Sequence, residues 1–162
     1  MQPVLQQKDL KEIIKEEYRK CAIDPVYFFR RFGVIQHPLR GRLNFILYKF
    51  QERVLQQLRE HDYNIILKSR QLGISTLTAA YALWIMLFNS DKNVLVIATK
   101  QDIAKNIVHK VKYMYENLPS WLKIECVEDN KLNLRFANGS QIKAESSTTT
   151  SGRSEAAAML II

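Results

Sequence analysis

The sequence predicts an α/β fold with a mainly parallel sheet and one β-hairpin, and three observations lead to this prediction. Two apolar runs of strand length, "YNIILKS" from Tyr63 and "NVLVIAT" from Asn93, lie on either side of a helix-forming run. Strands that are apolar throughout are typical of parallel sheets, which are covered on both faces. A second helical run follows, and strand, helix, strand, helix is the signature of right-handed crossover units. Finally, Asn138-Gly139 between two alternating segments is a strong hairpin signal.

The other elements follow from hydrophobic periodicity and from start and stop signals. Apolar residues recur at helical spacing behind Asp9, and "DPVYFFRRFG" places Pro25 at the start and Gly33 at the end of a second short helix. The stretch "VIQHPLRGRLNF" holds a proline and a glycine without a helical period, so we expect a connector there. Further helices are predicted over residues 47–61 and 75–88 and from Thr99 to just before Pro119, and "MLII" is predicted to be a strand.

Length and charge narrow the classes of protein to consider. The 162 residues suffice for one domain with a real core, and we expect a helical segment with its connector over residues 1–40 and an α/β domain over residues 41–162. A net charge of +8 favours a polyanionic partner such as nucleic acid or nucleotide, although solvated lysines would also account for it. Cys21 and Cys126 show no metal-type or disulfide pattern, which fits a reducing compartment. The charged N-terminus excludes a signal peptide, and Leu77–Phe88 is too short to span a bilayer, so we expect a soluble protein without a membrane partner.

The turn after the first predicted strand has the outline of a phosphate-binding loop. In the pattern G-x-x-x-x-G-K-[ST], Gly73 takes the second glycine position and Ser75 supplies the hydroxyl that would hold magnesium, but Ile74 replaces the lysine. Lys68 occupies the first glycine position, and its side chain reaches about 6 Å, far enough to approach a phosphate from the other end of a curled loop. The alternative is a surface turn in which Lys68 and Arg70 are merely solvated.

The segment "KSRQLGIST" resembles the deviant Walker A loop of the large terminase subunits of tailed bacteriophages, which are the ATPase motors that package viral DNA. The family writes this loop as S-R-Q-x-G-K-[ST], and some members place the lysine at the loop start. The resemblance covers about residues 25–162 and implies an ASCE-type P-loop NTPase, a three-layer sandwich that is incomplete at its C-terminal end. It implies ATP and Mg²⁺ as cofactors, bound at Lys68, Ser69, Arg70, Gln71, Leu72, Gly73, Ile74, Ser75 and Thr76, with Ser75 as the magnesium ligand.

Upstream, "LNFILYKFQERVL" resembles the adenine-recognition segment of that family. Gln51 would pair with the adenine edge, because an amide both donates and accepts hydrogen bonds, and Tyr48 or Phe50 would supply an apolar wall. The alternative for Gln51 is an ordinary amide on a helix surface.

Downstream, "TTTSGRSEAAAMLII" resembles the approach to Walker B. Arg153 is a candidate arginine finger or else an exposed loop arginine, and Arg70 is a candidate for phosphate contact in cis or for sensing the catalytic glutamate; with Lys68 these are the predicted catalytic residues. In the family an Asp-Glu pair follows the strand, to hold magnesium and to activate the attacking water. The sequence ends at Ile162, where this pair would begin, so we expect weak or no ATPase activity from this chain alone.

The implied function is ATP-driven translocation of double-stranded DNA into a procapsid in the host cytoplasm. The implied partners are DNA, a portal protein, a small terminase subunit and sister subunits in a homo-oligomeric ring. A helicase-like DNA-dependent ATPase is an alternative that Ile74 disfavours, and a catalytically inactive nucleotide-binding remnant is another.

The remaining residues of interest have plainer interpretations. Trp84 and Met86 are interpreted as core residues. The three histidines share no metal spacing; they are His37, His61 and His109. The lysines of the helix before Pro119 are interpreted as a solvated helix face rather than a DNA path; they are Lys105, Lys110 and Lys112.

Overall fold

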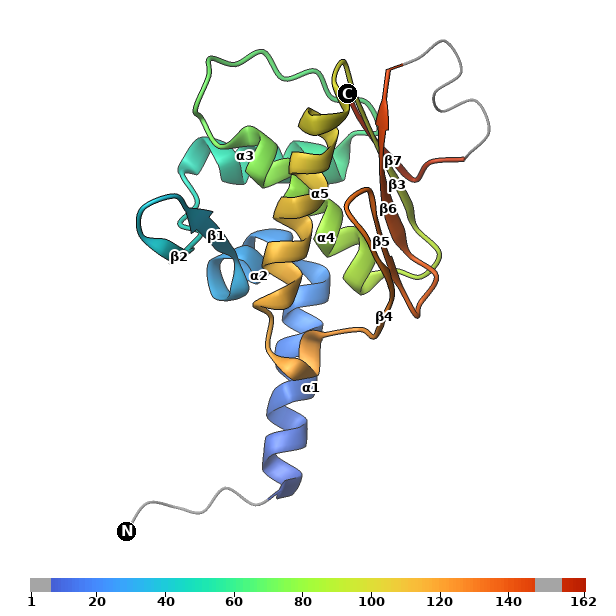
Figure 1. Ribbon diagram of the computed structural model, residues 1–162. Helices are drawn as coiled ribbons and strands as arrows, with labels where there is room; N and C mark the ends of the chain where they lie inside the picture. The colour runs from blue at the N-terminus through green and yellow to red at the C-terminus, as the bar shows by residue number, and fades with distance from the viewer. Residues whose placement is uncertain (1–6, 148–155) are drawn as a thin grey trace.

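The computed structural model describes residues 7–147 and 156–162, and its centre is a mixed five-stranded sheet (Figure 1). The strand order is β4-β5-β6-β3-β7. β3 pairs in parallel with both β6 and β7, whereas β4 with β5 and β5 with β6 are antiparallel. The prediction of a mainly parallel sheet is therefore right for the centre of the sheet and wrong for its β4–β5 side. The bounds are β3 (Asn93–Ala98), β4 (Cys126–Asp129), β5 (Asn133–Phe136), β6 (Gln141–Ser146) and β7 (Met159–Ile161).

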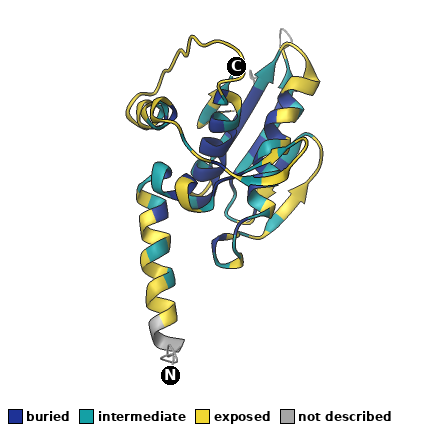
Figure 2. Ribbon diagram, turned by 90° about the vertical axis from the view of Figure 1, so that its left-hand side faces the viewer, coloured by how far each residue is buried: buried dark blue, intermediate teal, exposed yellow. Residues whose placement is uncertain are grey.

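Two helices, α4 (Ile74–Phe88) and α5 (Gln101–Glu116), pack against each other beside the sheet and form most of the core. α4 is apolar on nearly every side, and Figure 2 shows it and the adjoining strands as the most deeply buried part of the molecule. Trp84 and Met86 are buried as predicted, and the Trp84 indole Nε1 donates a hydrogen bond to the Cys21 carbonyl at 2.8 Å. All three predicted helices that follow the connector are confirmed.

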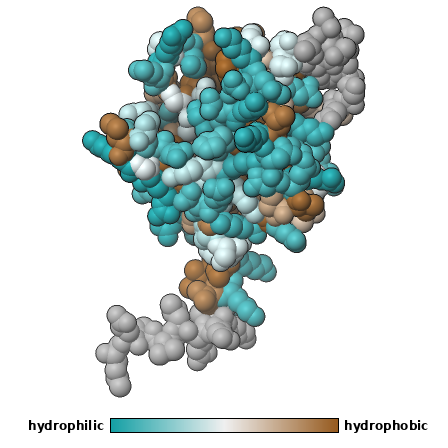
Figure 3. Space-filling model, viewed as in Figure 1, coloured by the Kyte–Doolittle hydropathy of each residue, from teal (hydrophilic) through white to brown (hydrophobic). Residues whose placement is uncertain are grey.

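The N-terminal helices join the same core through one end of α1 (Gln7–Ile23). Cys21 near its C-terminal end is buried, whereas the rest of α1 projects from the body of the molecule (Figures 1 and 2). Apolar side chains gather on this projecting helix beside an otherwise mostly hydrophilic face (Figure 3). α2 (Pro25–Phe32) begins as predicted, because the Asp24 carboxylate accepts a hydrogen bond from the Val26 N–H at 2.8 Å. α3 (Lys49–Glu60) and a short 3₁₀ turn, η1 (Ser120–Leu122), complete the helices of the described residues.

The predicted connector before α3 is wrong, because these residues form a β-hairpin. β1 (Val34–His37) pairs in antiparallel fashion with β2 (Gly41–Asn44). The His37 ring Nδ1 accepts hydrogen bonds from the N–H groups of Leu39 and Arg40, which closes the turn. The proline and the glycine thus lie at the turn rather than interrupting a strand. The hairpin also spans residue 40, the predicted boundary between the two parts of the chain, and that division stays a prediction.

The predicted strand from Tyr63 to Ser69 is also wrong for this structure. The segment is not assigned to any strand, and Ile65 and Leu67 are fully exposed. An apolar run supplies side chains for burial, but a strand also needs a hydrogen-bonded neighbour. Among the described strands, β7 lies at the edge of the sheet and pairs only with β3.

The predicted hairpin around Asn138-Gly139 is confirmed between β5 and β6. Gly139 has φ +82°, and its N–H donates to the Phe136 carbonyl at 3.0 Å. A Cβ atom there would lie 2.0 Å from Asp91 Oδ1, so the turn requires glycine for space as well as for backbone conformation. None of the helices in the described ranges has the length and apolar character needed to cross a membrane.

Candidate functional site

The site is the turn that leads into α4, where the sequence places its phosphate-binding loop. Gly73 immediately precedes the helix with φ +70°, and Gln71 also has a positive φ of 64°. The first N–H groups of any α-helix have no partner within the helix, and they carry its positive dipole end. Ser75 is exposed in this first turn, whereas Ile74, which stands in the usual lysine position, is buried in the core. The start of α4 thus offers backbone donors and one hydroxyl to an anion.

The basic residues of the loop, Lys68 and Arg70, are exposed, and their hydrogen bonds to other described residues do not reach the start of α4. The Lys68 ammonium donates to its neighbour's carbonyl, Ser69 O, at 3.3 Å. Within the described part of the chain, no hydrogen bond or ion pair ties Lys68 or Arg70 to α4. The cations are therefore free to turn toward a ligand.

Gln51 is buried between the first turn of α3 and the loop. Its side chain is 2% exposed, so it is not a surface amide. Its Oε1 accepts from the Tyr48 N–H at 3.0 Å, and its Nε2 donates to the Leu72 carbonyl at 3.0 Å. A Cβ on Gly73 would lie 2.9 Å from the same Nε2. Gln51 thus ties the first turn of α3 to the loop, and its adenine role stays a prediction that would require it to exchange one of these bonds.

An aromatic pair lies beside Gln51. The rings of Tyr48 and Phe50 stack with centroids 5.8 Å apart and an interplanar angle of 8°. Both are partly exposed, so this pair offers an apolar surface next to the loop. Arg153, the predicted arginine finger, lies outside the described residues.

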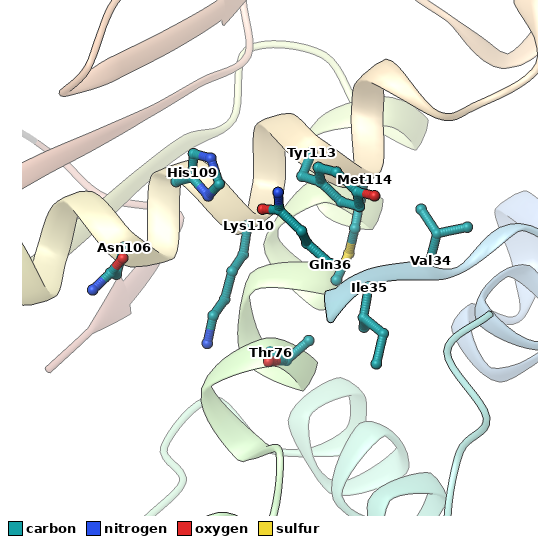
Figure 4. Close-up of a pocket in the computed structure, with 9 residues that line it drawn as sticks. All are labelled: Val34, Ile35, Gln36, Thr76, Asn106, His109, Lys110, Tyr113 and Met114. Carbon is teal, nitrogen blue, oxygen red and sulfur yellow. The ribbon is translucent and has the colours of Figure 1, made fainter. Parts of the chain in front are cut away.

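A cavity of about 120 Å³ lies between the first turn of α4, the strand β1 and one side of α5 (Figure 4). Sequence reasoning missed this feature, although a polar stripe at spacing i, i+3, i+4, i+7 on α5 was the available signal. Lys110 belongs to that stripe and extends toward the first turn of α4, where Thr76 lies (Figure 4). The lining residues are Val34, Ile35, Gln36, Thr76, Asn106, His109, Lys110, Tyr113 and Met114.

The other lysines of α5 are paired with aspartates. Lys112 contacts Asp129, and Lys105 lies 3.2 Å from Asp102. The Lys112 side chain is only 14% exposed, so the interpretation of the three lysines as a solvated face is wrong for Lys112 and also for the half-buried Lys110.

Metal ligands are sparse in the described ranges, which bring together no group of three or more His, Cys, Asp or Glu side chains suited to a metal. Ser75 is thus a single oxygen donor. Magnesium takes six oxygens and is usually held by one or two carboxylates together with substrate phosphates and water. The described residues fit a phosphate group better than they fit a protein-bound magnesium ion.

The chain matches a family described as "Terminase large subunit, T4likevirus-type, N-terminal" over residues 65–162. This region begins within the exposed apolar run and includes the loop, α4, α5 and the whole five-stranded sheet. The chain belongs to this family. A role in phage DNA packaging follows from that membership, and the resemblance inferred from the loop is confirmed.

Proposed function

We propose that this terminase chain binds ATP with its loop Lys68–Thr76, as the nucleotide-binding part of an ATPase that drives DNA packaging. The observation that carries the proposal is the loop itself. It lies within the region matched to the family, and it enters α4 through a left-handed Gly73 with Ser75 exposed in the first turn. Backbone donors at a helix start, a nearby hydroxyl and mobile cations are the groups that phosphate recognition uses.

Each residue has a separate proposed role. The Lys68 ammonium would offset the negative charge of the terminal phosphates, and the first N–H groups of α4 would donate hydrogen bonds to the phosphate oxygens. Ser75 would contribute one oxygen to magnesium, which when bound would neutralise charge on the phosphates. The stacked Tyr48 and Phe50 would cover one face of the base. Arg70 and Arg153 would stabilise the transferring phosphoryl group, from the same or a neighbouring subunit.

We further propose that, when nucleotide binds, residues 63–68 form a sixth strand along the open edge of β7, which would complete the P-loop sandwich. A strand–helix–strand connection normally joins parallel strands, so the new strand would run parallel to β3 and therefore to β7. Burial of Ile65 and Leu67 in this way would contribute about 1.5–3 kcal/mol each. The pairing would bring the loop to the carboxyl edge of the sheet, where α/β proteins bind ligands.

In the whole protein, ATP hydrolysis would move double-stranded DNA into a procapsid. The proposed partners are DNA, a portal protein, a small terminase subunit and sister subunits in a ring, all in the host cytoplasm. Nucleotide binding without turnover is the second candidate for this chain. It is favoured because the described residues assemble no acidic cluster of the kind that holds magnesium and activates water.

An ATP-analogue titration with three forms of the chain tests the binding proposal. Lys68→Ala should weaken binding by about tenfold or more, since a charge-assisted contact to phosphate is worth about 1.5–3 kcal/mol. Lys49→Ala, which removes an exposed lysine from the first turn of α3, is the matched control and should bind as the unaltered chain does. Equal affinities for all three forms would refute the role of Lys68. Measuring phosphate release on the same samples separates an ATPase from a binding module.

Gln51→Ala tests how the amide acts. An adenine contact predicts weaker binding of ATP with no change for pyrophosphate, which has no base. The hydrogen bond to Leu72 predicts instead that both ligands bind more weakly, because the loop loses its anchor. The two affinities therefore choose between recognition of the base and positioning of the loop.

A further inference from the structure

The cavity beside α5 contains a cation that has no partner among the described residues. Lys110 is half-buried, and no hydrogen bond or ion pair is made by its ammonium group to any other described residue. Lys105 and Lys112 on the same helix each have an aspartate partner. Burial also lowers the pKa of the Lys110 ammonium, because the charged form loses hydration. A partly desolvated charge without a counter-ion is unfavourable, and a bound anion would offset that cost.

The walls of the cavity supply hydrogen-bond donors and no negative charge. The hydroxyls of Thr76 and Tyr113 and the amide of Asn106 can each donate, and none of the described lining residues is acidic. Val34, Ile35 and Met114 form the apolar part of the lining. This set of groups fits a compact oxyanion and would be poor for a metal cation.

The cavity is large enough for a small anion. Its volume of about 120 Å³ accommodates a tetrahedral oxyanion, and it is partly open to solvent. Thr76 belongs both to this cavity and to the loop proposed to bind nucleotide. A phosphate group in the cavity would therefore lie next to that loop, on the α5 side of α4 (Figure 4).

We propose that this cavity is a phosphate subsite in which Lys110 supplies the positive charge. The phosphate is either free inorganic phosphate or a phosphoryl group of a nucleotide held by the neighbouring loop. The subsite goes beyond the proposed function and does not require it, since the cavity and its lysine are present whether or not Lys68 binds a nucleotide.

The first test titrates the full chain with inorganic phosphate while backbone amide NMR signals are followed. Shifts are expected at Thr76, Asn106 and Tyr113. Lys110→Gln should weaken phosphate binding by about tenfold or more, whereas Lys110→Arg should retain most of it. Lys105→Gln is the matched control, since it removes a lysine from the same helix outside the cavity lining, and its affinity should be unchanged.

Spectra recorded without phosphate show whether each variant is folded. Phosphate should also raise the melting temperature of the unaltered chain and of Lys105→Gln, but not that of Lys110→Gln, because only a ligand bound to the folded state stabilises it. Phosphate affinity that is the same with and without Lys110 would overturn the proposal. Shifts confined to residues 68–75, or a response to duplex DNA without a response to phosphate, would overturn it as well.

A second arm identifies the source of the phosphate. If an ATP analogue competes with phosphate for the Lys110 cavity, the ligand is a phosphoryl group of the nucleotide; if both bind together, it is free phosphate. Lys68→Ala separates the two proposals. If Lys68→Ala leaves the affinity for ATP unchanged, the nucleotide role of Lys68 is refuted. The phosphate subsite still stands in that case, provided that phosphate binding depends on Lys110.

Discussion

The two apolar runs of this chain are both long enough to form a strand, but they lie in opposite environments. "NVLVIA" forms β3, in which Val94, Leu95 and Val96 are all buried. "YNIILK" has almost the same apolar content, yet Ile65 and Leu67 are as exposed as they would be in an extended chain. β3 has hydrogen-bonded neighbours on both edges, β6 and β7, whereas the other run has none within the described strands.

The difference shows that an apolar run becomes a strand only where the sheet offers it an edge. Backbone N–H and C=O groups that leave water must find partners, and side-chain burial alone does not supply them. The environment of the exposed run also affects the proposed nucleotide site, because this run leads directly into Lys68 and the loop. If the run joins β7, the loop becomes fixed; if it stays exposed, the loop keeps the freedom of a surface turn.

Two leucine substitutions provide the largest expected contrast. Leu95→Ala in β3 should lower the free energy of unfolding by about 2–5 kcal/mol, since it leaves a cavity in packed surroundings. Leu67→Ala in the exposed run should change it by less than about 0.5 kcal/mol, because there is no packing to lose. Urea denaturation of both variants gives the two values. These values apply to the chain without nucleotide. A cost above about 2 kcal/mol at Leu67 would show that the run is already buried in the free chain, whereas the proposed sixth strand predicts a cost of this size only with an ATP analogue bound.

Substitutions at two glycines test the contact between Gln51 and the loop. Gly73 and Gly41 have nearly the same backbone conformation, with φ +70° and +67°, so alanine at either position should cost about 1 kcal/mol in left-handed strain. At Gly41 nothing lies within 4 Å of the new Cβ, whereas at Gly73 the Gln51 Nε2 is 2.9 Å away. Gly73→Ala should therefore destabilise the chain more than Gly41→Ala, by thermal or urea unfolding.

Gln51→Ala should remove most of this difference, because the clashing amide is gone. An equal effect of the two glycine substitutions in the unaltered chain would show that the Gln51 contact with the loop does not form in solution.

The smallest expected effect concerns the two thiols. Burial raises the pKa of Cys21 to about 12, and partial burial also raises the pKa of Cys126, which lies on the outer strand β4 and is less buried than Cys21. At mildly alkaline pH a thiol reagent should modify Cys126 before Cys21, which should react only as the chain unfolds. Mass spectrometry of the partly modified chain would show which cysteine reacts first. Modification of both cysteines at the same rate would contradict the burial of Cys21 at the packed end of α1.

The raised pKa of Cys21 also makes the stability of the fold depend on pH. Between pH 9.0 and about 12 the unfolded chain loses the Cys21 proton while the folded chain keeps it, so stability should fall as pH rises through this window. Cys21→Ala should reduce that slope. Cys126, Tyr81 and Tyr115, whose pKa values are also raised by burial, would contribute to the remainder.

Local sequence signals were sufficient wherever a short segment determines its own structure. Asp24 and Pro25 define the start of α2, and Asn138-Gly139 defines the hairpin. The same is true of the loop, whose residue types and spacing identified the family before any contact was known. The β1–β2 hairpin was not predicted, because its turn is closed by the His37 ring rather than by a common turn pair.

Features that depend on distant segments could not be read from the sequence. The tie between Gln51 and Leu72 joins two elements, and neither residue shows a sign of the other. The Lys110 cavity brings α5 beside β1 and the first turn of α4, so the lysine looked like any other on a helix face. The exposed run is the same kind of case, since its apolar residues indicate a strand without indicating which edge it would join.

Hydrogen exchange at the loop, with and without an ATP analogue, is the decisive measurement. We predict that the nucleotide slows exchange of the amides from Gly73 to Ser75, where the phosphates would bind, and of those from Ile65 to Leu67, as this run joins the sheet. Exchange from Ile65 to Ser75 that is unchanged at a saturating concentration of the analogue would contradict it.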